Sequence, residues 1–471
     1  MSAISKSLVQ KLKAAFPELH IVTPDSPDYA KSIERNIKNT QKPAGVVVYA
    51  TSTKDVASLV EFTGANSLDV AVCGAGHSRI GASSTNGGVC IDLSKMQAIS
   101  VDTNTNHITV QGGAVLQDVY MAVEKYGLAL VGGLCSNVGI GGFALMGGYG
   151  WLTGAHGLAV DNIVRAEIVL ADGSVVIASR SENPDLYWAI RGAGPCFGIA
   201  TSIVFQGFVQ GPVWSGELTF SPAALGALVE FANHVLNVSK GESSMVMIQG
   251  QLPGSTEPLV VVEVFYNGTE DEAKGFFAPL LKLGPIKDST KMMPFSQTTG
   301  GGDDIPPGFG KGTGGGIMEP IDADFVESLY EDYLTFIKNV PDASESLIAY
   351  EIHPTYGTLL HSQNETAFPN RGTFGNVVIY AAYTKDESAP ACEEWCRKMH
   401  DKIHNDFERR KEVDGVDDTT KTGVGLGESP KRLYGVNYER LVRIKRIYDP
   451  QNVFNKCVDL LKESEESSII Q

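Results

Sequence analysis

The sequence predicts an α+β protein in which an alternating α/β region is followed by an antiparallel sheet covered by helices. From about residue 45 to about 210, short β-branched runs alternate with helical segments, and glycine-rich turns separate them. From about 210 to 425 the strands and helices are longer, which is typical of one sheet with helices on one face. We therefore expect two architecturally different regions in one chain.

The elements of the first region follow from local patterns. GVVVYA is a compact β-branched strand, and Ser52 is placed to cap the helix DVASLVEFTGA that follows it. DVAVC and GVCIDL predict two further strands, and a helix is expected near 115–125. IVRAEIVLADGSVVIAS predicts a hairpin with its turn at Asp172–Gly173.

The second region shows longer periodic segments. We expect strands in VWSGELTF, MVMIQGQL, PLVVVEVFY, LIAYEIHP and NVVIYAAY. Helices are expected near 222–237, 270–282, 322–338 and 386–411, with a last helix in YERLVRIKRIYDP. The glycine-rich segment 296–316 is expected to be a long loop that can cover a site, and 413–430 is a second such segment.

Bulk properties exclude several functions. The 471 residues carry a formal net charge of −17, which argues against a nucleic-acid or anionic-membrane partner. No apolar run approaches a membrane span, and the first twenty residues lack the apolar core of a signal peptide. The seven cysteines are odd in number and lack metal-type clustering, and we expect Cys392 and Cys396 to pack as small residues on a helix. An intracellular, cytoplasmic protein with reduced thiols and no membrane partner is expected.

The loop CGAGHSRIG, residues 73–81, looks like a phosphate-binding turn with a histidine in its middle. A third glycine is missing and no helix follows, so it is not a Rossmann fingerprint. Backbone amides around Gly74, Gly76 and Ser78 can still form an anion nest, and a plain turn is an equal alternative at this point.

Two further glycine-rich stretches lie in the first region, at 132–162 and 184–202. Glycine-rich backbone is costly to order and is retained where the chain must approach something closely. Three such turns in one α/β region indicate an extended ligand such as a dinucleotide.

Six segments together resemble the FAD-linked oxidases of the vanillyl-alcohol oxidase superfamily, and most of all the berberine-bridge-enzyme-like branch. They are PAGVVVYATSTKDVASLV, CGAGHSRIGASS with GVCIDLSKM, GGLCSNVGIGGF, GLAVDNIVRAEIVLADG, PDLYWAIRGAGPCFG and YGVNYERLVRIKRIYDPQNVF. The resemblance covers most of the chain. It implies a two-part FAD-binding domain of the PCMH type at 1–208, a substrate-binding domain at 209–425, and a C-terminal segment, 426–471, that returns to the FAD domain.

The resemblance implies two covalent bonds to FAD, from His77 to the flavin 8α-methyl and from Cys135 to flavin C6. A neutral imidazole is a competent nucleophile near pH 7, and backbone amides favour the thiolate that the second bond needs. The alternatives are a loop histidine with local hydrogen bonds and a small buried cysteine. Some relatives keep only the histidine bond.

The same stretches supply the other expected cofactor contacts. Val138 resembles the oxygen-permissive form of the family, which implies O₂ as electron acceptor and hydrogen peroxide as product. Asn437 is expected to dock the last helix beside the flavin. With His77 and Cys135, the expected FAD-binding residues are Gly74, Ala75, Gly76, Ser78, Val138, Gly139, Gly141, Gly142 and Asn437.

The catalytic base is harder to place. Many branch members carry a tyrosine motif before the terminal helix region, but ERRKEVDGVDDTTKTG has no tyrosine here. Glu351 and His353 are two apart and share one face of a strand, and Tyr380 lies on the adjoining predicted strand, so these three are the candidate catalytic residues. By the family's geometry this sheet lies over the flavin. A solvent-facing Glu351 and His353 is an even alternative, and a metal site at His400 and His404 is weaker than an exposed helix face.

The leading hypothesis is therefore an FAD-dependent oxidase. A small specialised metabolite gives hydride to the flavin, a side chain removes a proton, and O₂ reoxidises the cofactor. The missing tyrosine keeps a non-redox cyclase or isomerase open, in which the flavin pocket acts as scaffold, and also a flavin-binding relic without activity. A secreted oligosaccharide oxidase is disfavoured because no signal peptide is seen.

Overall fold

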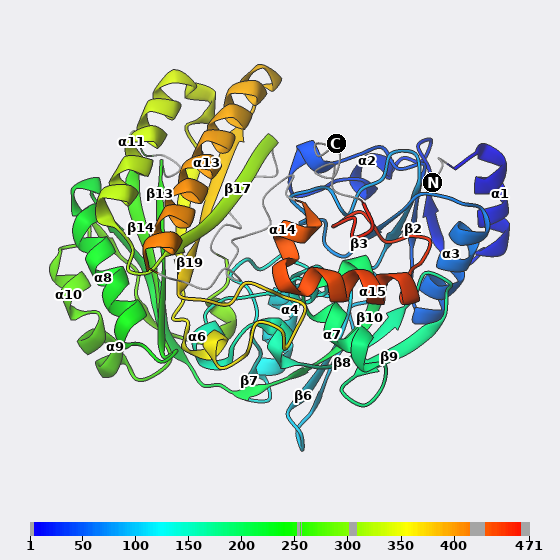
Figure 1. Cartoon of the computed structure of the whole chain (residues 1–471), viewed down its shortest axis with the longest axis horizontal. Coiled ribbons are helices and arrows are strands. Elements are labelled where there is room, and N and C mark those ends of the chain that lie inside the picture. Colours follow the sequence, from blue (N-terminus) through cyan, green and yellow to red (C-terminus); the bar gives the residue numbers. More distant parts are fainter. Residues whose placement is uncertain (1–3, 252–254, 256, 301–308, 415–428, 463–471) are drawn as a thin grey trace.

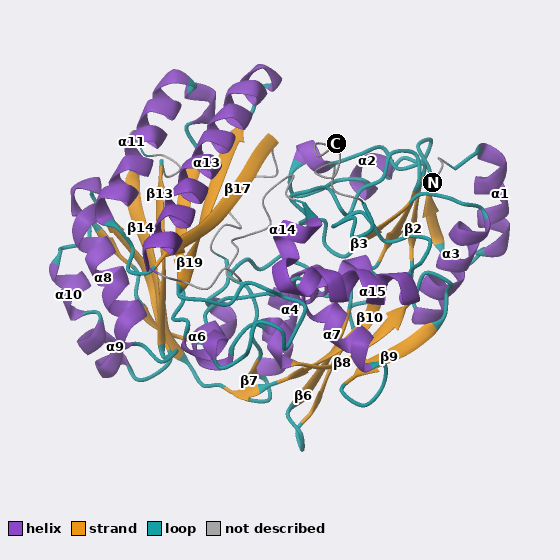
Figure 2. Cartoon of the chain, in the orientation of Figure 1, coloured by secondary structure: helices purple, strands orange, loops and turns teal. Residues whose placement is uncertain are grey.

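The computed structural model describes residues 4–251, 255, 257–300, 309–414 and 429–462. Two bodies lie side by side (Figure 1). One holds two small sheets with their helices and both ends of the described chain, and the other holds a single large sheet (Figure 2). Among the described helices, none is both long enough and apolar enough to span a bilayer.

The first small sheet has the strand order β1-β2-β4-β3, and β2, β4 and β3 run parallel. Its strands are β1 (His20–Val22), β2 (Val46–Tyr49), β3 (Val70–Cys73) and β4 (Val89–Asp92), and its helices are α1 (Lys6–Ala15), α2 (Tyr29–Ser32) and α3 (Thr53–Ala65). As predicted, the Ser52 hydroxyl caps α3 by accepting the Asp55 amide.

The second small sheet is antiparallel throughout, in the order β5-β6-β10-β8-β9. It comprises β5 (Ile99–Asp102), β6 (His107–Gln111), β8 (Ile163–Val169), β9 (Val175–Ser179) and β10 (Ile199–Gln206). Its helices are α4 (Leu116–Glu124), α5 (Ile140–Leu145), α6 (Thr153–His156) and α7 (Pro184–Ala193), and β7 (Leu128–Ala129) pairs with β11 (Phe208–Val209). The β8–β9 hairpin is confirmed, with Gly173 at φ +84° in its turn.

The large sheet has the order β15-β12-β14-β13-β18-β19-β17, with β16 beside β12. Its strands are β12 (Val213–Phe220), β13 (Ser243–Gly250), β14 (Leu259–Tyr266), β15 (Lys287–Asp288), β16 (Lys291–Met293), β17 (Phe309–Met318), β18 (Leu347–Ile352) and β19 (Phe374–Tyr383). Five helices cover one face, α8 (Leu225–Val238), α9 (Glu270–Phe276), α10 (Ala278–Lys282), α11 (Ala323–Asn339) and α13 (Ala389–Asp414) (Figure 1). The predicted one-sided α+β architecture is confirmed, and the bare face turns toward the N-terminal body.

The prediction of a loop over 296–316 is wrong for its second part, because 309–316 belongs to strand β17, which pairs with β19. Glycine is disfavoured in β-strands, so the glycine-rich sequence predicted a loop. In strand β17, neighbouring side chains lie too close to the backbone for any residue larger than glycine at two positions. A Cβ on Gly310 would lie 2.3 Å from the Tyr380 hydroxyl oxygen, and one on Gly315 would lie 2.7 Å from Cγ2 of Ile403. Residues 301–308 and most of 413–430 lie outside the described residues.

The end of the chain docks on the N-terminal body. Helix α14 (Pro430–Tyr434) leads into α15 (Tyr438–Tyr448), which packs beside α7. The Lys445 ammonium is fully buried and donates to the Asp449 carboxylate and to the carbonyl oxygens of Cys196 and Phe454. A buried cation with three acceptors fixes the helix in one position.

A segment that we call the strap, residues 354–373, joins β18 to β19 by crossing onto the N-terminal body. It contains the short helix α12 (Tyr356–Leu359), which lies beside α6 (Figure 1). The indole N–H of Trp188 and the guanidinium of Arg191, both on α7, donate to strap carbonyls. The Arg371 guanidinium forms a two-pronged, almost completely buried ion pair with Asp161.

We expect Asp161→Asn to lower the free energy of unfolding by about 3 kcal/mol, because the Arg371 charge stays buried without its counter-ion. Denaturant unfolding measures the effect. Asp185→Asn is the matched control, since Asp185 pairs with Arg440 on the exposed surface and its loss is expected to cost less than about 1 kcal/mol. Equal losses in the two variants would contradict the expectation.

Candidate active site

The loop 73–81 and the stretch 135–142 lie against each other in close contacts at glycines. A Cβ on Gly139 would lie 3.1 Å from the backbone nitrogen of Ala75. Cβ atoms on Gly74 and Gly141 would lie 3.4 Å and 3.0 Å from the same acceptor, the carbonyl oxygen of Gly112. The structure therefore brings two of the three predicted glycine-rich turns together.

The loop 73–81 offers a set of backbone donors. In the ranges that the structure describes, the amides of Gly74, Ala75, Gly76 and Ser78 donate no hydrogen bond. Gly76 has φ +75°, and behind it the buried Arg35 guanidinium donates to the carbonyl oxygen of Ser83. Unused amides backed by a buried cation form a nest for an anion, and this fits a pyrophosphate.

The two residues expected to bond the flavin are placed in these neighbouring segments. His77 and Cys135 are both half-buried. Val138 packs against the core of the N-terminal body, and a Cβ on Gly142 would meet nothing within 4 Å. The segments therefore carry a nucleophilic side chain each and leave open space beside Gly142.

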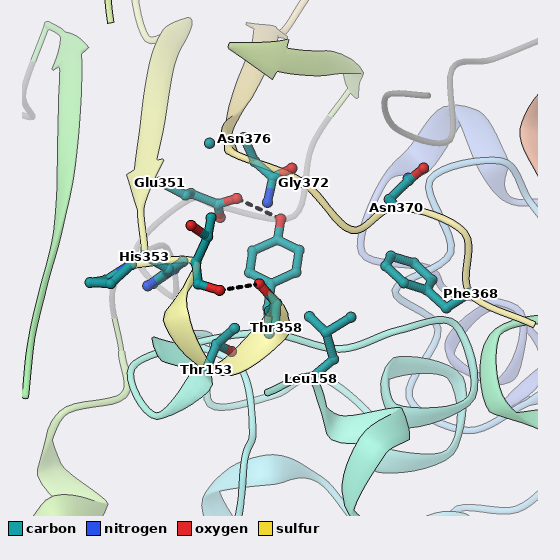
Figure 3. A pocket seen from close by; sticks show the side chains of 13 residues that line it. Thr153, Leu158, Glu351, His353, Thr358, Phe368, Asn370, Gly372 and Asn376 are labelled. Atoms are coloured by element: carbon teal, nitrogen blue, oxygen red, sulfur yellow. Dashed lines mark hydrogen bonds between the residues drawn. The ribbon is translucent and has the colours of Figure 1, made fainter. Parts of the chain in front are cut away.

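A pocket lies between the large sheet and the N-terminal body, and Glu351 and Tyr149 meet in it. The Tyr149 hydroxyl donates a 2.5 Å hydrogen bond to Oε2 of Glu351 (Figure 3). Tyr149 comes from the second glycine-rich stretch and Glu351 from β18, so the pair joins the two bodies. The side chains of Tyr149 and Glu351 both line the pocket.

Burial raises the pKa of the Glu351 carboxyl, while the Tyr149 hydrogen bond and the charge of Arg79 oppose the rise. Burial and the neighbouring Glu351 raise the pKa of Tyr149 well above its ordinary value. At neutral pH the phenol therefore keeps its proton, and the carboxylate is the group of this pair that can accept one.

His353 lies just beyond the end of β18 and lines the same pocket. Its side chain is 7 % exposed, and neither ring nitrogen has a hydrogen-bond partner in the described part of the chain. Burial lowers the pKa of His353 to about 4, so the imidazole is neutral at physiological pH.

The rest of the pocket wall comes from the strap, β19 and the N-terminal body. The strap contributes Phe368 and Asn370, across the pocket from Glu351 and His353 in Figure 3, and Gly372 and Asn376 lie beside Glu351, with Asn376 paired to it across β18 and β19. The Asn370 Oδ1 atom is buried without a hydrogen-bond partner among the described residues. Leu158 and Thr153 close the floor.

Two other predicted residues, Tyr380 and Asn437, lie outside the pocket wall. Tyr380 is buried over Gly310 and is not among the residues that line the pocket. The Asn437 amide donates to the strap carbonyls of Gln363 and Thr366, so it ties the last helix to the strap.

The two histidines on helix α13, His400 and His404, contact protein groups. Nδ1 of His400 lies 3.2 Å from the carbonyl oxygen of Gly314, and His404 contacts Arg432. No cluster of three or more metal-type ligands occurs among the described residues. Cys392 and Cys396 are buried on α13 without a disulfide between them.

Sequence reasoning missed Tyr149 and Asn370. Tyr149 stands within GGYG, between Gly148 at φ +71° and Gly150, and a tyrosine held inside such backbone was the available signal. Asn370 lies in a polar connection whose course depends on the Arg371–Asp161 pair, and no local pattern indicates it.

Two protein-family models match parts of this chain. The model of the FAD binding domain matches residues 44–179, which include both glycine-rich segments. The model described as berberine and berberine like matches residues 417–456, which include α14 and α15.

Relatives cover almost the whole chain. The FAD-linked oxidoreductase pgmH of Aspergillus terreus is 35% identical over 97% of this chain and 96% of its own length. The structure of 6-hydroxy-D-nicotine oxidase from Arthrobacter nicotinovorans has 26% identity and a TM-score of 0.79 over 93% of this chain and 97% of its own. Physcomitrella patens BBE-like 1 shares the fold, with a TM-score of 0.83 at 22% identity over 97% of this chain and all of its own.

The neutral His353 predicts a pH dependence of stability. Its folded pKa of about 4 lies below the ordinary value of about 6.5, so lowering the pH through that window protonates only the unfolded chain. We expect this residue to remove up to about 3 kcal/mol of stability by pH 4. Melting temperatures of wild type and His353→Phe across this window test it, and a constant difference between the two proteins would contradict it.

Proposed function

Because the chain belongs to the FAD-linked oxidoreductases of the berberine-bridge-enzyme-like family, we propose that it is an oxidase that uses covalently bound FAD and O₂ on a small-molecule substrate. The observation that carries the proposal is the hydrogen-bonded pair of Tyr149 and Glu351 in the pocket between the two bodies. In this pair, Glu351 would be the proton acceptor, a role that the absence of the family's tyrosine motif leaves unassigned in the sequence.

The cofactor site is built from the loop 73–81 and the stretch 135–142. The unused amides of Gly74, Ala75, Gly76 and Ser78 would hold the pyrophosphate, and His77 and Cys135 would bond the flavin ring. When bound, FAD supplies the acceptor for a hydride from a substrate C–H bond. Val138, in the stretch beside it, resembles the oxygen-permissive form of the family, which supports O₂ as the acceptor and peroxide as the reduced product.

Glu351 would take the proton from the substrate O–H or N–H next to the carbon that is oxidised. A carboxyl whose pKa is raised by burial is a better base at neutral pH than an ordinary one, because its proton affinity is closer to that of the substrate. Tyr149 would hold the carboxylate in one orientation by its hydrogen bond. His353 is neutral and is placed to contact the substrate rather than to titrate with it.

We expect Glu351→Gln to slow flavin reduction by a substrate at least about 100-fold, because an amide cannot accept the proton. Tyr149→Phe keeps the carboxylate but loses its orienting donor, and a loss of about 10-fold is expected. Anaerobic stopped-flow bleaching measures both, with substrates first found by peroxide release. Glu345→Gln, an exposed position, is the control. Product formation without flavin bleaching, and unaffected by removal of O₂, would instead establish the non-redox alternative.

Covalent attachment has its own test. We expect denatured wild-type protein to retain FAD, with modified peptides that contain His77 and Cys135 in mass spectrometry. His77→Ala and Cys135→Ser are each expected to leave one attachment, and the double variant to release all FAD on denaturation. Cys457→Ser, another half-buried cysteine, is the control. Release of FAD from the denatured wild type would refute covalent attachment but not FAD binding.

A further inference from the structure

Four side chains from separate parts of the chain gather where the C-terminal segment docks on the N-terminal body. They are Met146 at the end of α5, Cys196 just after α7, Tyr434 at the end of α14 and Cys457 beyond α15. Helix α7 packs against both α5 and α15, which brings these parts of the chain together. We call the four residues the sulfur cluster.

The three sulfur atoms of the cluster lie close together. The Sγ atom of Cys457 lies 3.8 Å from Sδ of Met146. The Sγ atom of Cys196 lies 3.4 Å from the carbonyl oxygen of Val458, the residue that follows Cys457. Burial and then the Cys196 thiol raise the pKa of Cys457, and such an influence acts at short range. Two thiols and one thioether therefore share a small space.

The fourth member, Tyr434, is a hydrogen-bond donor without a strong acceptor. Its side chain is 1 % exposed, and its hydroxyl meets no oxygen or nitrogen partner among the described residues. Burial, together with the neighbouring thiols of Cys196 and Cys457, raises the pKa of Tyr434. A neutral thiol is a weak acceptor, whereas an ionised acceptor forms a strong hydrogen bond. The buried phenol is therefore matched to a neighbouring thiol that has lost its proton.

The ligand set indicates which ion fits. Among the described residues, no group of three or more cysteine, histidine, aspartate and glutamate side chains forms a metal site. Structural Zn²⁺ sites use four ligands drawn from thiolate, imidazole and carboxylate, so two cysteines are too few. Thiolate and thioether ligands together select Cu⁺.

The surroundings suit the charge of such a complex. One Cu⁺ ion with two thiolates carries one negative charge. The Lys445 ammonium donates to the carbonyl oxygen of Cys196. Burial raises the pKa of Cys196, and the charge of Lys445 opposes that rise. A cation and the Tyr434 donor therefore lie beside the thiolates, as a buried anion requires.

We propose that the sulfur cluster binds one Cu⁺ ion through the thiolates of Cys196 and Cys457 and the thioether of Met146. On binding, each thiol gives its proton to solvent, three Cu–S bonds form, and no group is oxidised or reduced. Tyr434 then donates to a thiolate. Cys457 and Met146 are half-buried, which leaves the ion a path from the surface. The ion would tie the C-terminal segment to the N-terminal body, because the ligands come from both.

The flavin-loaded protein is titrated anaerobically with Cu⁺ in competition with a chromophoric Cu⁺ chelator. We expect one equivalent that depends on the cluster, with only sulfur ligands in X-ray absorption. Cys196→Ser and Cys457→Ser should each weaken this binding at least about 100-fold, because each removes a thiolate ligand. Met146→Leu and Tyr434→Phe should each weaken it about 10-fold, through loss of the thioether and of the hydrogen bond to the thiolate.

Cys392→Ser and Cys396→Ser are the matched controls, because these two cysteines are also buried but lie on α13 of the other body. They should keep the wild-type affinity. Flavin absorbance checks that each variant is folded. Met146→Leu and Tyr434→Phe keep the bulk of the side chain, so they test the site even where a serine variant loses its flavin.

Lack of Cu⁺ uptake by the wild type, or affinity that is unchanged in both Cys196→Ser and Cys457→Ser, would overturn the proposal. Tighter binding of Zn²⁺ than of Cu⁺ would overturn it as well, because the set of ligands would then be a different one. So would a disulfide between Cys196 and Cys457 that persists in the reduced, Cu⁺-treated protein in mass spectrometry. The measurement is metal affinity, so its outcome is independent of the proposed oxidase activity.

Discussion

The buried ion pair between Arg371 and Asp161 is the contact on which the pocket depends. Arg371 belongs to the strap between two strands of the large sheet, and Asp161 belongs to the N-terminal body. Next to Arg371 on the strap stand Asn370 and Phe368, so the ion pair sets the position of a whole pocket wall. Separating two desolvated charges is costly, because each is then buried without its counter-ion. The ion pair therefore fixes one wall of the pocket that is proposed to bind the substrate.

Some glycines of the N-terminal body leave room for the strap, just as others are expected to leave room for the cofactor. A Cβ on Gly147 would lie 2.5 Å from the Phe368 ring, and one on Gly192 would lie 2.2 Å from the Phe368 backbone nitrogen. Both glycines also have positive φ values, +114° and +133°. Phe368 thus occupies a niche made of two glycine-rich turns. Sequence reasoning assigned these turns to an extended ligand, whereas part of their glycine content accommodates the strap.

Local patterns predicted most elements and left the long-range assembly open. The α3 cap at Ser52 and the hairpin turn at Gly173 are encoded within a few residues, so they could be read from the sequence. Strand β17 could not, because its glycines are required by Tyr380 and Ile403, which are distant in the chain. Glu351 and His353 were found from strand alternation. Their partner Tyr149 was not, because the contact joins positions about two hundred residues apart.

The acid–base chemistry proposed for the Tyr149–Glu351 pair depends on the contact between the two bodies. Glu351 alone, on a sheet face open to water, would titrate as an ordinary carboxyl; the facing body raises its pKa by burial. The same body supplies the two groups that oppose this rise, the Tyr149 hydroxyl and the charge of Arg79. Arg79 stands two residues after His77 in the loop 73–81, and its guanidinium lies against Gly312 of β17. The loop expected to hold the cofactor therefore also lowers the pKa of Glu351, so the proposed cofactor binding and the proposed proton transfer share one structural element.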